Sequence, residues 1–298
     1  MERPAAPCAG CWLHVTRPTA ADLAAVRDFG VPASLLDHVS DIDERPRVEH
    51  AGECVLVVMN YPLRRDEATG PPWRTLPLSV LIAPQGVVTL SQAGTPFLQP
   101  LLDGHVPGLA TDRGTEFVLR VFLKLADACL RGLREINAGV EALEDELKRS
   151  IRNEEVLGLL DFQKSLTYFA TGLKANELVL ERLQRVPTLD WAAQDQELLD
   201  DVRVELRQAV GMVDIADRVL SDMMDAFASI VSNNLNSVMK VLTSVTIMMA
   251  VPTLIASVYG MNVGLPGSHS PLAFAGIVAL SVAICACLFI VFRRRNWL

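Results

Sequence analysis

The sequence predicts an α+β membrane protein, in which a mixed α/β domain and a long helical stalk precede two C-terminal membrane-spanning helices. Asp, Glu, Lys and Arg make up 21% of the chain but are absent from the 52 residues Val241 to Phe292. Short apolar runs of strand-like composition lie in the first third. Between Pro107 and Pro187 there is no proline, which favours long helices. At 298 residues the chain is long enough for these separate parts.

Residues 1–110 are expected to form the α/β domain, because short elements alternate with turn residues there. The patterns predict helices over 19–30 (TAADLAAVRDFG) and 32–41 (PASLLDHVSD). Cys8 and Cys11 form a CxxC with no second ligand pair nearby, which favours a disordered or merely thiol-bearing terminus over a metal site. Strands are predicted over ECVLVVMNY (53–61), LPLSVLIA (76–83) and GVVTLSQ (86–92).

Residues 111–240 are expected to form the stalk, with paired helices over 112–149 and 152–185 and a turn at Pro187. A further helix starts after Asp190 and continues into the first membrane span. Its apolar residues recur at alternating steps of three and four, a heptad seam that needs either a second copy or the preceding helices as its partner. The seam comprises Leu199, Val202, Leu206, Ala209, Val213, Ala216, Leu220, Met223, Phe227 and Ile230.

Negative charge is concentrated on this helix. Ten acids and three arginines lie between Asp190 and Asp225, a net charge of −7 in a chain whose total is −8. For any single carboxylate, a solvated helix face is the simpler interpretation. Brought together by oligomerisation, the group would form a strongly negative column below the membrane.

Two membrane spans are predicted over 241–259 and 272–292, because each apolar segment is long enough to cross the roughly 30 Å hydrocarbon core. Residues 260–271 form the loop between them, and the basic tail 293–298 (RRRNWL) follows. Lys240 and the tail place both ends in the cytoplasm by the positive-inside rule. The N-terminus lacks the apolar stretch of a signal peptide, so we expect a multi-pass protein of the cytoplasmic membrane with cytosolic termini.

The first span carries a stripe of residues that are mostly small or able to hydrogen-bond. Such a stripe is typical of close helix packing in lipid or of a wall that faces water. Because one span cannot enclose a pore and two barely can, the second interpretation requires several subunits around an axis. Polar residues at both ends, Asn236 and Asn262, favour water. The stripe comprises Asn236, Met239, Thr243, Thr246, Ala250, Thr253, Ser257 and Gly260.

The span ends in YGMNV, Tyr259 to Val263. Gly260 would let the helix end and expose its last carbonyls. Asn262 would add a neutral side-chain oxygen at the outer mouth, and a ring of such oxygens can hydrogen-bond the water shell of an ion that dehydrates reluctantly. This end of the stripe therefore suits a hydrated, hard cation.

Together, Gly260-Met261-Asn262 after a first span, a second span and the basic end RRRNWL resemble the CorA family of divalent cation channels. NSVMKVLT (236–243) resembles the family's run into the pore helix, and DERPRVEH (43–50) resembles its cytosolic domain. The resemblance implies a homopentameric funnel whose first spans line the pore. It implies Mg²⁺ as substrate, with Co²⁺ and Ni²⁺ in some members, and no resident cofactor. A related branch carries Zn²⁺.

By position, the resemblance makes Asn262 the selectivity asparagine and Asn236, Met239, Leu242 and Thr253 pore-lining residues. Asp201 falls where the family binds regulatory Mg²⁺ between subunits. Asp200 and Asp201 lie beside the heptad seam, so we expect oligomerisation to bring them near a neighbour's carboxylates.

There are two departures from the family's pattern. The outer loop GLPGSHSP (264–271) has no acidic residue, and Ala250 and Met249 leave open where the pore narrows.

The leading hypothesis is gated, passive Mg²⁺ uptake with feedback by cytosolic Mg²⁺. Zn²⁺ transport is the alternative, but the stripe lacks the His, Cys and carboxylate ligands that Zn²⁺ prefers. A membrane-anchored scaffold is an alternative of another class, although an anchor needs no polar stripe. We expect no enzyme, because His38, His50 and His105 lack a nucleophile or paired carboxylates at motif spacing. No nucleic-acid partner is expected.

Overall fold

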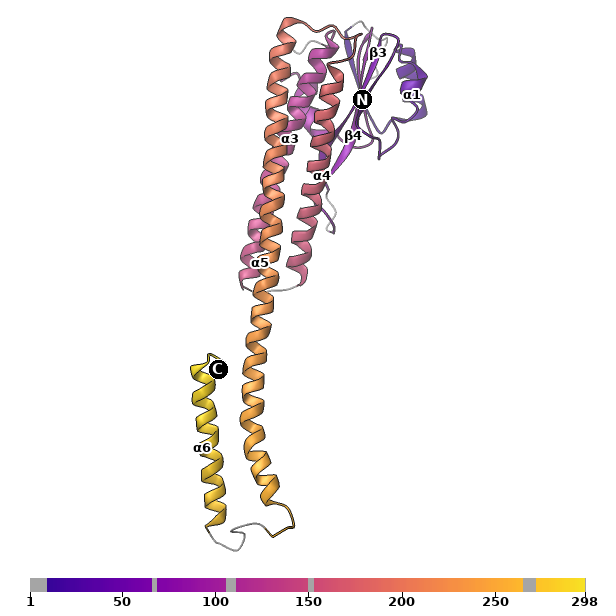
Figure 1. Cartoon of the computed structure of the whole chain (residues 1–298). Coiled ribbons are helices and arrows are strands. Elements are labelled where there is room, and N and C mark those ends of the chain that lie inside the picture. Colours follow the sequence, from indigo (N-terminus) through magenta and orange to yellow (C-terminus); the bar gives the residue numbers. More distant parts are fainter. Residues whose placement is uncertain (1–9, 66–68, 106–110, 150–152, 265–271, 298) are drawn as a thin grey trace. The chain divides into compact units, whose positions relative to one another are not determined.

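The computed structural model describes residues 10–65, 69–105, 111–149, 153–264 and 272–297. The chain divides into two compact units, Met1–Met223 and Met224–Leu298. The first unit holds a sheet and long helices, and the second holds the rest of helix α5 and helix α6 (Figure 1).

A five-stranded sheet forms the centre of the first unit, with the strand order β1-β5-β4-β3-β2. Its inner strands pair antiparallel, and β1 pairs parallel with β5 at one edge. Gly86 makes this edge possible, since its φ is +144° and a Cβ there would collide with the Cys11 carbonyl oxygen. The strands are β1 (Cys11–Thr16), β2 (Arg47–Ala51), β3 (Cys54–Arg64), β4 (Trp73–Ala83) and β5 (Gly86–Ser91).

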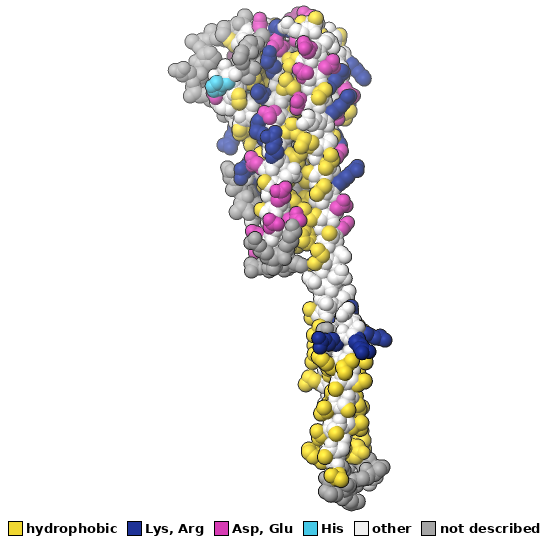
Figure 2. Space-filling view, turned by 90° about the vertical axis from the view of Figure 1, so that its left-hand side faces the viewer, with side chains coloured by type: hydrophobic (Ala, Val, Ile, Leu, Met, Phe, Trp, Pro, Cys, Tyr) yellow, Lys and Arg dark blue, Asp and Glu magenta, His cyan; other side chains and the backbone are white. Residues whose placement is uncertain are grey.

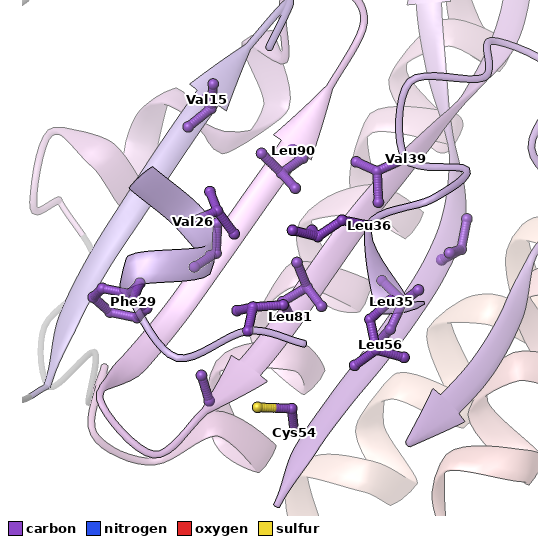
Figure 3. Close-up of a cluster of buried hydrophobic side chains, with 14 residues drawn as sticks. Val15, Val26, Phe29, Leu35, Leu36, Val39, Cys54, Leu56, Leu81 and Leu90 are labelled. Carbon is purple, nitrogen blue, oxygen red and sulfur yellow. The ribbon is translucent and has the colours of Figure 1, made fainter. Parts of the chain in front are cut away.

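One face of the sheet is covered by helix α1 (Ala20–Asp28) and the turns that follow it. Thr19 caps α1 through a capping box with Asp22, which explains why the helix starts there. Figure 3 shows Val26 and Phe29 from this segment packed toward Leu81 and Leu90 of the sheet, in one buried cluster.

The helix predicted over 32–41 is wrong. Only a 3₁₀ turn, η1 (Ala33–Leu35), forms there, because Leu35, Leu36 and Val39 all bury in the same cluster. The segment forms successive tight turns instead of a continuous helix. One of them is closed by the hydrogen bond from the Val39 N–H to the Leu36 carbonyl at 3.3 Å.

Strands β3, β4 and β5 confirm the three predicted runs, but β1 and β2 were missed. Strand β2 is an edge strand in which Arg47, Glu49 and His50 hide the apolar pattern. The expectation of a thiol-bearing terminus is wrong for Cys11, which is disulfide-bonded and starts β1. Cys8 lies outside the described residues.

Helices α3 (Gly114–Arg149) and α4 (Asn153–Leu183) confirm the predicted pair and lie on the other side of the sheet from α1 (Figure 1). The side chain of Asn176 on α4 is fully buried. Its Oδ1 accepts from the Asn60 N–H at 2.8 Å, and its Nδ2 donates to the Asn60 carbonyl at 2.7 Å. This pair of bonds fixes α4 against β3, because breaking either would leave a buried polar group without a partner.

Helix α5 (Ala193–Tyr259) is continuous over 67 residues, as predicted. Within the first unit its seam packs on the preceding helices, with Leu199, Val202, Leu206, Ala209, Val213 and Leu220 buried. Arg203 of α5 donates to the Gln184 side-chain oxygen at 2.6 Å, and Lys174 of α4 pairs with Asp214 at 2.9 Å. The preceding helices are therefore the seam's partner over this length.

Candidate functional site

Two helices in the structure are long and apolar enough to cross a membrane, α5 and α6 (Ala273–Arg294). Their most apolar windows are only 6% and 0% buried, whereas the core helix of a soluble protein would be mostly buried. Figure 2 shows apolar side chains distributed over this pair. Surfaces of this kind suit lipid or other subunits.

A proline in α5 leaves a backbone carbonyl without its helical donor, and α6 supplies one. Pro252 has no N–H, so the Met248 carbonyl, four residues earlier, loses its helical donor. Cys285 of α6 supplies a donor, with its Sγ 3.5 Å from the Met248 oxygen. The fully buried Ser244 and the groove lined by Met248 and Pro252 mark the side of α5 that faces α6.

Thr246, Ala250, Thr253 and Ser257 of the predicted stripe lie on the side of α5 that faces away from α6, whereas its last member, Gly260, lines the groove shared with α6. At about 100° per residue, positions 246, 250, 253 and 257 are roughly half a turn from 244, 248, 252 and 256. Thr246, Ala250, Thr253 and Ser257 line one open groove of about 680 Å³. The predicted pore-lining residues are all exposed in the chain, namely Asn236, Met239, Leu242, Thr243, Thr246, Ala250, Thr253 and Ser257.

The hydroxyls of this stripe are oriented by the helix itself. Thr246 Oγ1 donates to the Leu242 carbonyl, and Thr253 Oγ1 donates to the Met249 carbonyl, both at 2.8 Å. Each hydroxyl has thereby used its only proton, and its oxygen lone pairs remain available. A hydrated cation presents the hydrogens of its water shell outward, so these oxygens can accept from the shell without removing it.

The Gly260-Met261-Asn262 motif follows the end of α5, which falls at Tyr259 as predicted. The turn tightens there, as the Met261 N–H bonds to the Val258 carbonyl at 3.3 Å. Gly260 does not adopt the left-handed conformation of a typical helix-ending glycine. Gly260 instead continues the helical hydrogen bonding, with its N–H bonded to the Ala256 carbonyl at 2.9 Å.

Asn262 is exposed, and its carboxamide makes no hydrogen bond to another described residue. Its side-chain oxygen is therefore open to solvent in this part of the chain. Loop positions 265–271, including His269, lie outside the described residues.

Asp200 and Asp201 lie near the start of α5. Asp200 pairs with Arg203 at 3.1 Å and its side chain is 72% exposed. Asp201 lines a pocket of about 320 Å³ together with Glu116, Glu197 and Arg120. No group of three or more His, Cys, Asp or Glu among the described residues of this single chain could hold a metal ion.

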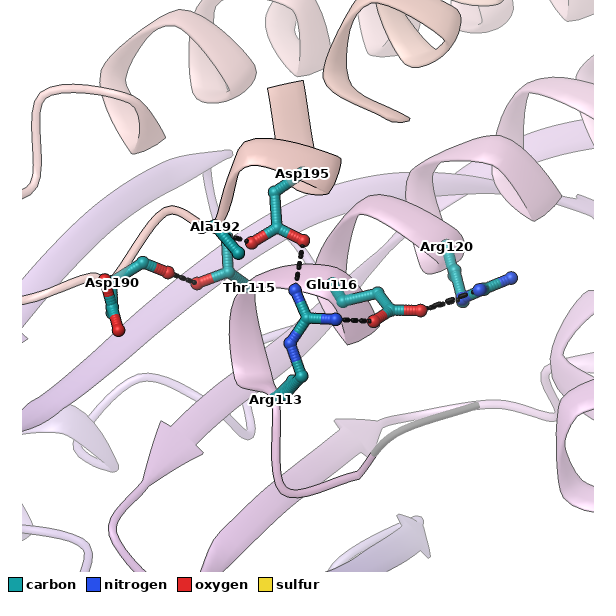
Figure 4. A network of polar contacts seen from close by, with 7 residues as sticks. All are labelled: Arg113, Thr115, Glu116, Arg120, Asp190, Ala192 and Asp195. Carbon is teal, nitrogen blue, oxygen red and sulfur yellow. Dashed lines mark hydrogen bonds and ion pairs between the residues drawn. The ribbon is translucent and has the colours of Figure 1, made fainter. Parts of the chain in front are cut away.

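Beside this pocket, an ionic network joins the starts of α3 and α5 (Figure 4). Arg113 pairs with Glu116 and with Asp195, both at 2.6 Å, and Glu116 also pairs with Arg120. Asp195 accepts from the Ala192 N–H at 2.9 Å and its side chain is only 2% exposed. A solvated face is therefore the wrong interpretation for this carboxylate. Its place in the first turn of α5 was the available signal.

Comparison with known proteins agrees with these features. The profile of the family described as "CorA-like Mg2+ transporter protein" matches residues 9–294. The "Cobalt/magnesium transport protein CorA" of Methanocaldococcus jannaschii is 29% identical over 96% of this chain and 91% of its own length. The protein of the same description from Thermotoga maritima is 22% identical over 96% of this chain and 83% of its own.

A solved structure gives the same result for the fold. The complete structure of the CorA magnesium transporter from M. jannaschii superposes with a TM-score of 0.83 at 28% identity, over 96% of this chain and 91% of that one. The match includes the α/β domain, the long helix and the two C-terminal apolar helices. On the strength of the profile match, the chain belongs to the CorA family.

Proposed function

We propose that this protein carries hydrated divalent cations, Mg²⁺ foremost, passively into the cytoplasm through a homopentameric pore lined by α5. Divalent cation transport is what its CorA relatives support. Co²⁺ and Ni²⁺ are further candidate substrates. The protein lies in the cytoplasmic membrane with both termini in the cytosol, and it needs no enzymatic activity or cofactor.

The observation that carries this proposal is the position of the stripe. Its hydroxyl and small residues face away from α6, on an open groove, and continue to the Gly260-Met261-Asn262 motif. A single copy leaves this face exposed, and in lipid the remaining lone pairs of its hydroxyl oxygens would have no donor, whereas water or a hydrated ion supplies one. Several copies around an axis resolve this, with α5 inside and α6 outside.

The energy for uptake comes from the membrane potential. A divalent cation gains about 4.6 kcal/mol per 100 mV of inside-negative potential, so no nucleotide hydrolysis is required. The neutral oxygens of Thr246, Thr253 and Asn262 would guide the hydrated ion without holding it tightly. A carboxylate at the mouth would bind the ion more strongly and slow its release.

Feedback by cytosolic Mg²⁺ is the second part of the proposal, and Asp201 is its main residue. Glu197 also lines the pocket beside it, but Glu116 there already pairs with Arg113 and Arg120, and the described residues of one chain do not supply a complete ligand set. A neighbouring subunit would have to add carboxylates. Bound Mg²⁺ would then hold subunits together against like-charge repulsion and keep the pore closed, and loss of Mg²⁺ would release them.

Two alternatives make different predictions. A Zn²⁺ transporter would need His, Cys or carboxylate ligands along its path, and none of these residues occurs from Asn236 to Asn262. A membrane-anchored scaffold would move no ion at all.

The experiment is uptake into liposomes that contain the purified protein and a cation-sensitive dye. With Mg²⁺ outside and the interior negative, we expect rapid dye response to Mg²⁺ and little response to Zn²⁺ at equal concentration. A dye response to Zn²⁺ alone would support the zinc alternative. If correctly assembled protein gives no dye response to either ion, the scaffold is favoured.

A further inference from the structure

The basic residues around the ends of the two apolar helices share their unit with a single acidic residue, Asp225, which lies fifteen positions before Lys240. From Ala226 to Leu298 the chain has four positive side chains, Lys240 and Arg293 to Arg295, and no Asp or Glu. All four are exposed. No ion pair joins any of them to another described residue, in contrast with the paired arginines at the start of α3.

These four charges lie at one level of the helix pair. The bond from Cys285 to the Met248 carbonyl fixes the antiparallel register. Because Lys240 is eight residues before Met248 and Arg293 is eight residues after Cys285, equal helical rise brings Lys240 level with Arg293. Figure 2 shows Lys and Arg side chains gathered at one end of this apolar pair.

The chain after α6 turns back toward the last turn of the helix, so Trp297 lies beside the arginines. Asn296 has a φ of +54°, and the Trp297 N–H returns to the Phe292 carbonyl at 3.0 Å. The Trp297 ring stacks on Phe292, with centroids 5.6 Å apart and the planes 2° from parallel. Tryptophan favours the headgroup region of a bilayer, so this fold-back places an interfacial anchor beside the arginines.

We propose that Lys240 and Arg293 to Arg295, with Trp297 beside them, form a binding site for the headgroup of an anionic phospholipid of the inner leaflet. Like charges grouped within a Debye length, about 8 Å at physiological salt, repel one another unless an anion lies between them. Phospholipid phosphate is the anion present at this depth, and arginine binds it in a bidentate manner. The site depends on the membrane placement of α5 and α6 and is independent of which cation the protein carries.

Positive charge at a helix C-terminus also stabilises the helix dipole and sets topology, and neither effect requires a particular lipid. The test must therefore compare lipids that differ only in charge. Full-length protein in detergent micelles is mixed with equal phosphatidylglycerol and phosphatidylcholine, and native mass spectrometry counts the lipids that it retains. We expect the wild type to retain phosphatidylglycerol in preference.

Each lost charge should lower this retention about fivefold, so the double variant Lys240→Gln/Arg293→Gln should lose about twenty-five-fold. The matched control is Lys164→Gln/Lys174→Gln, which removes two exposed charges from α4 and should retain lipid as the wild type does. Equal retention of both lipids by the wild type, or unchanged retention in the Lys240/Arg293 variant, would overturn the proposal. If that variant does not assemble, the wild-type comparison decides alone.

Inorganic phosphate in excess separates a lipid site from a general phosphate site. Retention of phosphatidylglycerol in its presence is expected, and complete displacement would overturn the assignment to lipid. Because retention is counted without any ion flux, a protein that binds phosphatidylglycerol but moves no Mg²⁺ would contradict the proposed function only.

Discussion

Asn262 offers a neutral oxygen where many ion-binding sites use carboxylates. It stands just beyond the end of α5, exposed and without a described hydrogen-bond partner. Neutral oxygens in a ring can accept from the waters around Mg²⁺, which keeps its hydration shell more firmly than larger cations do. In the proposed pore, the Asn262 oxygen would therefore recognise the hydrated ion and still release it easily.

We expect Asn262→Ala to abolish Mg²⁺ uptake or reduce it at least about tenfold, because a hydrogen bond to a charged group contributes about 1.5–3 kcal/mol. Assembly, measured by size-exclusion chromatography, should not change. The control is Ser281→Ala on α6, where the lost hydroxyl bonds only to the Ile277 carbonyl. An Asn262→Ala protein that takes up Mg²⁺ at the wild-type rate would remove this residue from the selectivity site.

Some site residues could be found from sequence and others could not. Asn262 and the stripe follow from a short motif and helical spacing, which are local properties. The role of Asp195 could not be found this way, because its partner Arg113 lies 82 positions earlier and the two meet only in the folded chain. Asp200 and Asp201 stay a prediction, since their proposed ligands belong to another subunit.

At the scale of elements, α6 completes the hydrogen bonding of α5 at one carbonyl. Proline inside a helix leaves a carbonyl without its donor, and in lipid no water replaces that donor. Cys285 provides it for Met248 from across the helix pair. The thiol is a weak donor, so its value lies in satisfying a group that would otherwise be left unbonded.

We therefore expect Cys285→Val to lower the free energy of unfolding of the helix pair by roughly 0.6–1.7 kcal/mol, the range measured for hydrogen bonds between membrane helices. Cys285→Ser keeps a donor of similar size and should be at least as stable as the wild type. Unfolding in mixed detergent–SDS micelles measures both. Equal stability of the valine and serine variants would show that the Met248 contact contributes nothing.

The two sides of α5 should differ in access to water. Thr246→Cys and Thr253→Cys should react with a small, membrane-impermeant thiol reagent, because both positions line the groove away from α6. Ser244→Cys is the matched control, since Ser244 is also a hydroxyl residue but is fully buried. Mass spectrometry of the labelled protein, with the wild type as background, gives the extent of reaction. Equal labelling at all three positions would mean that the stripe does not face water.

Element prediction succeeded where periodicity was strong and failed where structure depends on distant partners. The helices α3 to α6 carry long apolar repeats or uncharged stretches, and their predicted bounds agree closely with the structure. Strand β1 exists because β5, some 75 residues later in sequence, pairs with it. Residues 32–41 form turns instead of a helix because the packing of Leu35, Leu36 and Val39 overrides local propensity.

At the scale of the whole molecule, part of the apolar surface of α5 stays exposed after α5 has packed on its own chain. Its buried seam is covered by the preceding helices, yet Val204, Ile215 and Val219 remain 56–64% exposed. Apolar side chains in a row on a stalk helix suit contact with another copy. The homopentamer and the predicted domain boundaries at residues 110 and 240 remain proposals. In such an oligomer, the acidic residues of α5 near these exposed apolar side chains would couple subunit contact to Mg²⁺ binding.

We expect Mg²⁺ to protect the assembled wild type from limited proteolysis, and Asp200→Asn/Asp201→Asn to need a higher Mg²⁺ concentration for the same protection. The reason is that the lost carboxylates weaken a shared site between subunits. The control is Asp161→Asn on α4, whose carboxylate pairs with Lys164 outside this region. Indistinguishable titrations of the wild type and the double variant would exclude Asp200 and Asp201 from sensing.

The proposed function of the whole molecule is passage of Mg²⁺ driven by the membrane potential. Mg²⁺ influx into liposomes at controlled potentials measures this passage directly. A potassium gradient with valinomycin sets the interior negative, and an enclosed dye reports Mg²⁺ without any nucleotide present. Influx should rise as the interior becomes more negative, because about 4.6 kcal/mol per 100 mV favours entry of a divalent cation. Influx that does not change with potential, or no influx from correctly assembled protein at any potential, would contradict the proposed function.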